Sequence, residues 1–252
     1  FEKKTRSDGG WGNNHLILLA QNFTGYKNLM KLVTAGYLEG FYYRPRIDMD
    51  LLREYSEGLI CMSACLKGVV PEKMLKGDYE GARKEALLFS EIFQDRYYLE
   101  IQNHGIPEEE QNLKNMKKLS QDLNLPLVCT NDAHYAKKEH WEAHDIHICL
   151  GTGKERSDPN RLRYATPEFY FKTQDEMHKL FKEFPGAIEN TRKIADSIDI
   201  TLPIGESHLP NFPIPKEANT SDPDEYLKSI TESGAQNLYG EITPEIKKRL
   251  SH

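Results

Sequence analysis

The stretch PLVCTNDAHY, residues Pro126–Tyr135, joins an apolar run to a polar end. The run from Leu127 to Thr130 is apolar and partly β-branched, which predicts a buried strand. Side chains alternate in an extended chain, so Asp132 and His134 can aim a carboxylate and an imidazole at one point. That combination suits Zn²⁺, Mn²⁺ or Fe²⁺, and the alternative is an Asn-Asp turn followed by a merely polar histidine.

Three other apolar runs show the same organisation, an extended segment followed by a helical pattern. They cover residues 15–20, 58–64 and 97–101. Four successive strand–helix units predict an α/β fold with a parallel sheet covered by helices. Chemistry in such folds gathers at the carboxyl ends of the strands. Cys65, His104, and Asp132 with His134 all follow strand ends, which favours a site there.

Composition narrows the class of protein. The 252 residues are 38% hydrophobic and 29% charged, an ordinary globular mixture, and the net charge of −6 restricts any nucleic-acid contact to a local patch. Four cysteines without paired CxxC spacing indicate reduced thiols in a cytoplasmic protein. No run reaches membrane-spanning length and no signal peptide is visible, so no membrane partner is expected.

The chain divides into three parts by composition. Residues 1–200 hold the strand–helix units, residues 201–223 form a proline-rich linker, and residues 224–252 begin the next domain. Helix starts are predicted at Asp48, at the capping box Thr173–Glu176, and at Pro223. A polar opening and a helix-like end suggest that the chain is cut from a longer protein.

Several motifs, in order, resemble the polymerase-and-histidinol-phosphatase (PHP) domain of bacterial replicative DNA polymerase III α subunits. They are HLILLAQN from His15, GYKNL from Gly25, SACLKG from Ser63, YLEIQNHG from Tyr98, TNDAHY from Thr130, and residues 159–171. The resemblance covers essentially all 252 residues, including the linker LPNFPIP from Leu209 that leads toward the palm.

The resemblance implies a distorted (β/α)7 barrel that holds up to three metal ions. His15, Cys65, Asp132 and His134 match ligands of that cluster. The family's His-x-His motif, its Asp-His pair and its Glu strand should precede Phe1, and the polymerase aspartates should lie beyond His252. The expected fold is therefore an incomplete barrel with parallel strands and a partial metal site.

Further residues have two readings each. Glu100 and His104 would hydrogen-bond to the ligands and orient them, or they are a carboxylate that faces out of a strand and a loop histidine without a role in the site. Arg44, Arg46 and Lys67 would contact a phosphate, or carry solvated charge. The remaining cysteines, Cys61, Cys129 and Cys149, are assigned to the core, and His140, His144 and His147 to a surface face.

The resemblance implies a part of a DNA-directed DNA polymerase, a nucleotidyltransferase of DNA replication in the bacterial cytoplasm. Its PHP site would hydrolyse phosphodiesters in 3′→5′ proofreading with Zn, Mn or Fe, and the polymerase would use Mg. Expected partners are DNA, a sliding clamp and a proofreading subunit. The fragment alone is expected to be inactive. The alternative is a non-catalytic module that docks a separate proofreading subunit; a stand-alone histidinol-phosphate phosphatase would not need the linker.

Overall fold

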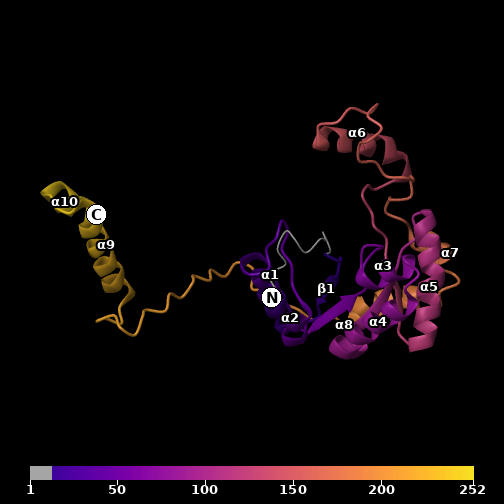
Figure 1. Cartoon of the computed structure of the whole chain (residues 1–252), viewed down its shortest axis with the longest axis horizontal. Coiled ribbons are helices and arrows are strands. Elements are labelled where there is room, and N and C mark those ends of the chain that lie inside the picture. The colour runs from indigo at the N-terminus through magenta and orange to yellow at the C-terminus, as the bar shows by residue number, and fades with distance from the viewer. Residues whose placement is uncertain (1–12) are drawn as a thin grey trace. The chain divides into compact units, whose positions relative to one another are not determined.

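The computed structural model describes residues 13–252, so most of the polar lead-in, residues 1–12, lies outside the described residues. The chain forms two compact units, and the boundary in the sequence lies between Leu202 and Pro203. The first unit carries the sheet and eight of the α-helices among the described residues (Figure 1). No helix in this part of the chain is both long and apolar enough to cross a membrane.

Four strands form one sheet in the order β1-β2-β3-β4. Their bounds are Ile17–Ala20, Leu59–Met62, Tyr97–Ile101 and Leu127–Cys129. Strands β2, β3 and β4 are parallel, as the strand–helix pattern predicts. Strand β1 is antiparallel to β2, with Ile17 opposite Met62 and Ala20 opposite Leu59. The parallel sheet expected from the sequence is therefore wrong for its first strand, and the (β/α)7 count stays a prediction.

Two helices, α1 (Phe23–Leu38) and α2 (Met49–Glu54), connect β1 to the antiparallel strand β2. The turn into α1 is tight: a Cβ on Gly25 would lie 1.8 Å from the Gly58 carbonyl oxygen, so only glycine fits there.

The other helices of the first unit cover the sheet and close the unit. Their bounds are Val69–Leu75 (α3), Tyr79–Phe93 (α4), Pro107–Leu123 (α5), Trp141–Thr152 (α6), Gln174–Leu180 (α7) and Ala187–Ser197 (α8). The predicted caps are confirmed, since Asp48 accepts from the Leu51 N–H at 3.0 Å and Thr173 with Glu176 forms a complete capping box. Helix α3 has no counterpart in the predicted elements.

The main core joins buried side chains of helices α1 to α5 to strands β2, β3 and β4, and α8 packs in a second, smaller cluster. Helix α4 buries Ala82, Ala86, Phe89 and Phe93, which recur every three to four residues on one face. The ring of Phe89 stacks on Tyr97 of β3, with centroids 5.6 Å apart. Each fully buried aromatic or aliphatic side chain stabilises the unit by about 1.5–3 kcal/mol, so this face fixes the strand ends that carry the site.

The second unit is a segment without helix or strand followed by two helices. Residues 203–222 have neither, and helices α9 (Pro223–Tyr239) and α10 (Pro244–Leu250) come after them. Asp222 caps α9 by accepting from the Asp224 N–H at 2.8 Å, and a proline opens each helix. Most of their apolar side chains are exposed.

Candidate metal centre

His15 meets Cys65 at one edge of the sheet. Because β1 runs against β2, the residue that precedes β1 lies beside the residues that follow β2. The Nδ1 atom of His15 is 3.4 Å from the Cys65 Sγ atom, and the His15 backbone N–H donates to the Lys67 carbonyl oxygen at 3.0 Å. The antiparallel strand therefore brings together two residues that are 50 positions apart in the sequence.

A tight turn after β2 presents Cys65. Ala64 has a φ of 63°, and a Cβ on Gly68 would lie 2.0 Å from the Ser63 carbonyl oxygen. The Ser63 hydroxyl accepts the Glu100 backbone N–H at 2.8 Å, which ties the turn to β3. Cys65 is partly exposed, whereas Cys61 is buried and its burial raises the pKa of its thiol, so Cys65 is the better-placed ligand.

Asp132 and His134 form a second donor pair beyond β4. Their Oδ1 and Nε2 atoms are 3.1 Å apart, and both side chains are partly exposed. Two donors on one tetrahedral Zn²⁺, with bonds of about 2.0–2.3 Å, lie roughly 3.3–3.8 Å apart, so both pairs have a separation close to that of ligands sharing an ion. The i, i+2 placement predicted from the sequence thus produces a usable pair of donors.

A strap, residues 166–172, holds the segment that carries this pair. The His134 N–H donates to the Phe169 carbonyl oxygen at 2.8 Å, and the Phe171 N–H donates to the Tyr135 carbonyl oxygen at 3.0 Å. The side chain of Asn131 donates to the Tyr170 carbonyl oxygen at 2.9 Å. The strap therefore pairs by backbone hydrogen bonds with the segment that follows β4 and limits the movement of Asp132 and His134.

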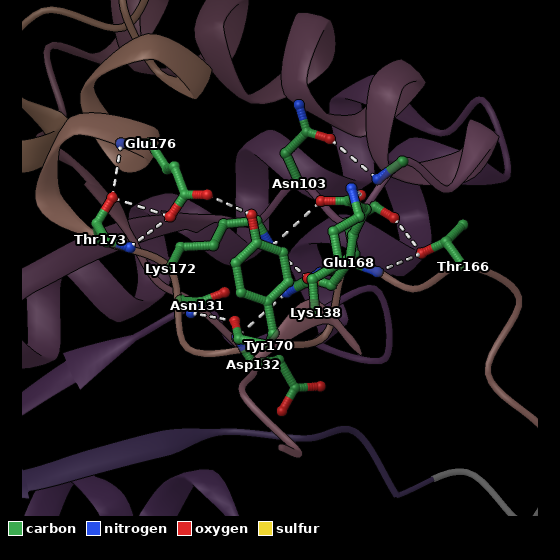
Figure 2. A network of polar contacts seen from close by, with 12 residues as sticks. Asn103, Asn131, Asp132, Lys138, Thr166, Glu168, Tyr170, Lys172, Thr173 and Glu176 are labelled. Carbon is green, nitrogen blue, oxygen red and sulfur yellow. Dashed lines mark hydrogen bonds and ion pairs between the residues drawn. The ribbon is translucent and has the colours of Figure 1, made fainter. Parts of the chain in front are cut away.

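Figure 2 shows the polar network that fastens the strap. Lys138 binds the Glu168 carboxylate, and Lys172 donates to the Glu168 carbonyl oxygen. The Lys172 ammonium also lies 4.5 Å from the centre of the Tyr170 ring, and burial lowers the pKa of this lysine. The Tyr170 hydroxyl donates to Glu176 at 2.6 Å, which joins the strap to the capping box of α7.

His104 uses both ring nitrogens within the protein. Its Nε2 accepts the Asp132 backbone N–H at 3.2 Å, so its Nδ1 carries the proton and donates to Glu109 Oε1 at 2.9 Å. The second oxygen of Glu109 accepts the His104 backbone N–H at 2.5 Å. The ring stacks on Phe169, with centroids 4.4 Å apart. His104 therefore positions Asp132 and leaves no nitrogen for an ion.

Glu100 is buried behind the same edge. Its Oε1 accepts from the Thr130 hydroxyl at 2.6 Å, and its Oε2 has no hydrogen-bond partner. Burial raises the pKa of this carboxyl. Glu100, Cys65 and Asn112 line, with four other residues, a gap that is too narrow for a water molecule, and the Asn112 Oδ1 is also unpaired. Unpaired acceptors behind Cys65 are compatible with a nearby cation or proton.

The four candidate ligands form two pairs and not one cluster. Among residues 13–252, no group of three or more His, Cys, Asp and Glu side chains could hold a metal ion. The residues present fit a divalent ion by donor type and by the separation within each pair. The convergence of all four on one ion stays a prediction.

The three candidate phosphate-binding residues occupy different settings. Lys67 follows Cys65 in the turn and is exposed, and Arg44 is exposed in the loop after α1. Arg46 is half-buried, donates from Nε to the Gly40 carbonyl oxygen at 3.0 Å, and lies over the Tyr42 ring at 5.0 Å. Lys67 is thus beside a donor pair, while Arg46 holds its own loop.

Sequence reasoning missed the aromatic surroundings of His134. The Tyr164 hydroxyl is 3.0 Å from the ring nitrogens of His134, and the Tyr164 and Phe169 rings lie 4.6 Å apart. His144 is half-buried, its ring centroid lies 5.0 Å from that of Tyr135, and burial lowers its pKa. The spacing of His140, His144 and His147 can be read from the sequence, but the contact of His144 with Tyr164, at 5.3 Å between ring centroids, depends on the fold.

Comparisons with known proteins agree with this architecture. A model of the PHP domain family matches residues 3–104. The chain is 47% identical over 249 residues to DNA polymerase III subunit alpha of Borreliella burgdorferi, which covers 98% of the chain and 21% of that protein. The corresponding proteins of Treponema pallidum and Thermus aquaticus are 41% and 38% identical, over 94% and 95% of the chain and 20% of each relative. The chain spans about a fifth of the length of these relatives, and the matches identify it as a PHP-domain member of the bacterial DNA polymerase III alpha family.

Proposed function

We propose that the chain is part of a replicative DNA-directed DNA polymerase and that its PHP domain binds a divalent metal ion. The relatives that it matches over nearly all of its length are DNA polymerase III alpha subunits. This supports DNA, a sliding clamp and a separate proofreading subunit as partners, Mg²⁺ as the ion of the polymerase reaction, and the bacterial cytoplasm as the location.

The metal proposal rests on one observation, the two donor pairs at the same edge of the sheet. His15 with Cys65 and Asp132 with His134 would hold the ion, and their nitrogen, sulfur and oxygen donors suit Zn²⁺, Mn²⁺ or Fe²⁺. A bound ion of this kind lowers the pKa of a coordinated water and neutralises phosphate charge. The protein's own part is to orient the donors.

That orientation comes from groups behind the ligands. His104 fixes the backbone of Asp132, and the strap fixes the backbone of His134. Buried Glu100 accepts a hydrogen bond from the hydroxyl of Thr130, which lies two residues before Asp132. Exposed Lys67, next to the His15–Cys65 pair, is placed to attract a phosphodiester. The arrangement supports hydrolysis of a 3′-terminal phosphodiester as the reaction.

A non-catalytic docking module is the second candidate. It is favoured by the absence of any group of three ligands among residues 13–252, because hydrolysis with clustered metals needs more donors than two. Helix α6 also exposes Ile146 and Leu150. For the same reason we expect weak hydrolysis at most from this chain alone.

The distinguishing experiment measures release of the 3′ nucleotide from labelled single-stranded DNA with Mn²⁺ or Zn²⁺. It compares the chain, its Asp132→Asn variant, and a full-length alpha subunit with and without the same substitution. We expect clear activity only in the full-length protein and its loss with Asp132→Asn. The docking module would be favoured if the full-length protein keeps its activity with Asp132→Asn, or if the unsubstituted full-length protein has no activity.

A further inference from the structure

One segment of the chain is positively charged although the chain as a whole is negative. Residues 23–46 have a formal charge of +3, from four basic residues and one acidic residue, in a chain whose net charge is −6. The same 24 residues hold six of the 25 aromatic residues of the chain. The basic residues are Lys27, Lys31, Arg44 and Arg46, and the aromatic residues are Phe23, Tyr26, Tyr37, Phe41, Tyr42 and Tyr43.

Three of these aromatic rings are largely exposed at the end of α1. Tyr37 is 58% exposed, and Phe41 and Tyr43 are each 56% exposed. The rings of Tyr37 and Phe41 are stacked, with centroids 6.3 Å apart and planes inclined by 25°. Neighbouring aromatic rings that are exposed together are uncommon on a surface that binds nothing, because exposed apolar area costs free energy that a binding partner would recover.

The loop that carries the rings has a defined backbone. Arg46 donates to the Gly40 carbonyl oxygen at 3.0 Å, and the Tyr42 N–H donates to the Arg44 carbonyl oxygen at 3.1 Å. Tyr43 has a φ of 59°, a left-handed conformation that costs about 1 kcal/mol or more for a bulky residue. The fold thus holds the ring in place at a conformational cost, which is typical of functional positions.

Helix α1 is anchored at its start and its end. Near its start, the Asn28 side chain donates to the Glu57 carbonyl oxygen at 3.0 Å. Near its end, Gly36 lies against the following loop, since a Cβ there would be 3.4 Å from the Arg46 carbonyl oxygen.

We propose that residues 37–46 bind single-stranded DNA. Tyr37, Phe41 and Tyr43 stack on unpaired bases, and Arg44 binds the phosphates between them. Exposed rings next to cations suit a strand that presents both π-faces and negative charge, and duplex DNA keeps its base faces covered. The choice of DNA rests on the proposed function; the stacking surface does not depend on the metal centre.

The test is fluorescence anisotropy of a labelled oligo(dT) of about 12 nucleotides, within the site size of single-strand binders. The full chain is titrated in EDTA, which separates this surface from any metal chemistry. We expect Phe41→Ala and Tyr43→Ala each to weaken binding by about fivefold, the low end for loss of one stacking ring. Phe41→Tyr keeps a ring and should bind like the parent chain, as should Tyr239→Ala, which removes a 59% exposed ring in α9.

Salt dependence tests the arginine separately. For single strands the slope of log affinity against log salt is about −0.7 for each phosphate contact, so Arg44→Ala should reduce the magnitude of the slope by about 0.7. The proposal is overturned if the parent chain does not bind oligo(dT), if it binds duplex DNA of equal length as tightly, or if Tyr239→Ala weakens binding as much as Phe41→Ala. Unchanged binding in both ring-to-alanine variants would assign the surface to a protein contact instead. None of these outcomes alters hydrolysis by the full-length protein, so the two proposals fail independently.

Discussion

Replacement of His104 by phenylalanine tests the buried support of the candidate centre. Phenylalanine retains the ring that stacks on Phe169 but has neither ring nitrogen. The change removes the hydrogen bond from Nδ1 to the Glu109 carboxylate and leaves the Asp132 N–H without its acceptor. His104 and Glu109 are almost fully buried, at 1% and 4% exposure, so water does not replace the lost partners.

The expected loss of unfolding free energy follows from these contacts. A hydrogen bond to a charged group contributes about 1.5–3 kcal/mol, and the neutral bond to the Asp132 N–H about 1 kcal/mol. We expect His104→Phe to lower the unfolding free energy by roughly 3 kcal/mol. Glu109→Gln keeps one acceptor oxygen and should lose about 1–3 kcal/mol, because one of the two His104 donors then has no partner.

Urea denaturation followed by tryptophan fluorescence reports the first unit, since Trp141 begins α6 of that unit. The two substitutions act on one hydrogen-bonded pair, so the double variant should lose less than the sum of the single losses, by 0.5 kcal/mol or more. A loss below about 1 kcal/mol for His104→Phe, or strict additivity in the double variant, would refute the positioning role of this histidine.

Three further predictions concern other parts of the chain. Burial raises the pKa of Glu100, so the folded protein keeps this proton to higher pH, and the carboxyl reduces stability as pH rises above its pKa in the unfolded chain. Glu100→Gln should therefore raise the urea midpoint of unfolding at pH 7 and have little effect on it at pH 4. A larger effect at pH 4 than at pH 7 would contradict the burial argument. Arg161 makes two bonds to Asp145, at 2.6 and 2.8 Å, so Arg161→Ala should speed tryptic cleavage after Lys154 and Arg156, two sites that the substitution leaves intact, while Arg161→Lys gives an intermediate rate. Equal rates at these two sites for all three proteins would exclude an anchoring role. Proteinase K should cut first between Leu209, which is 87% exposed, and Pro223, and protection of that stretch would show that it packs.

The strand and helix pattern could largely be predicted from the sequence because periodicity and caps are local. The strand ends, the capping box of Thr173 and the proline starts of α9 and α10 all depend on neighbouring residues. The direction of β1 is not local. Two helices connect the antiparallel pair β1 and β2, and two helices also connect the parallel pair β2 and β3, so a pattern of strand followed by helix does not fix the strand direction.

The candidate centre shows the same division. The Asp132–His134 pair could be predicted because both residues lie on one extended segment. The partners of His104 could not be predicted. Glu109 lies in the first turn of the next helix, α5, and Phe169 is 65 residues further along the chain. Tyr164 likewise reaches His134 only through the strap and the loop before it. Contacts made across the fold carry no periodic signal in the sequence.

The most direct test of the metal centre is a Co²⁺ titration of the chain followed by absorption spectroscopy. Co²⁺ replaces Zn²⁺ in such sites, and a cysteine thiolate ligand adds an intense charge-transfer band. We predict this band in the parent chain and in Cys149→Ala, which changes a buried cysteine outside the centre, and its loss in Cys65→Ser. The weaker visible bands should decrease in Asp132→Asn. A Co²⁺ spectrum that is the same in the parent chain, Cys65→Ser and Asp132→Asn would contradict the assignment of these residues as ligands.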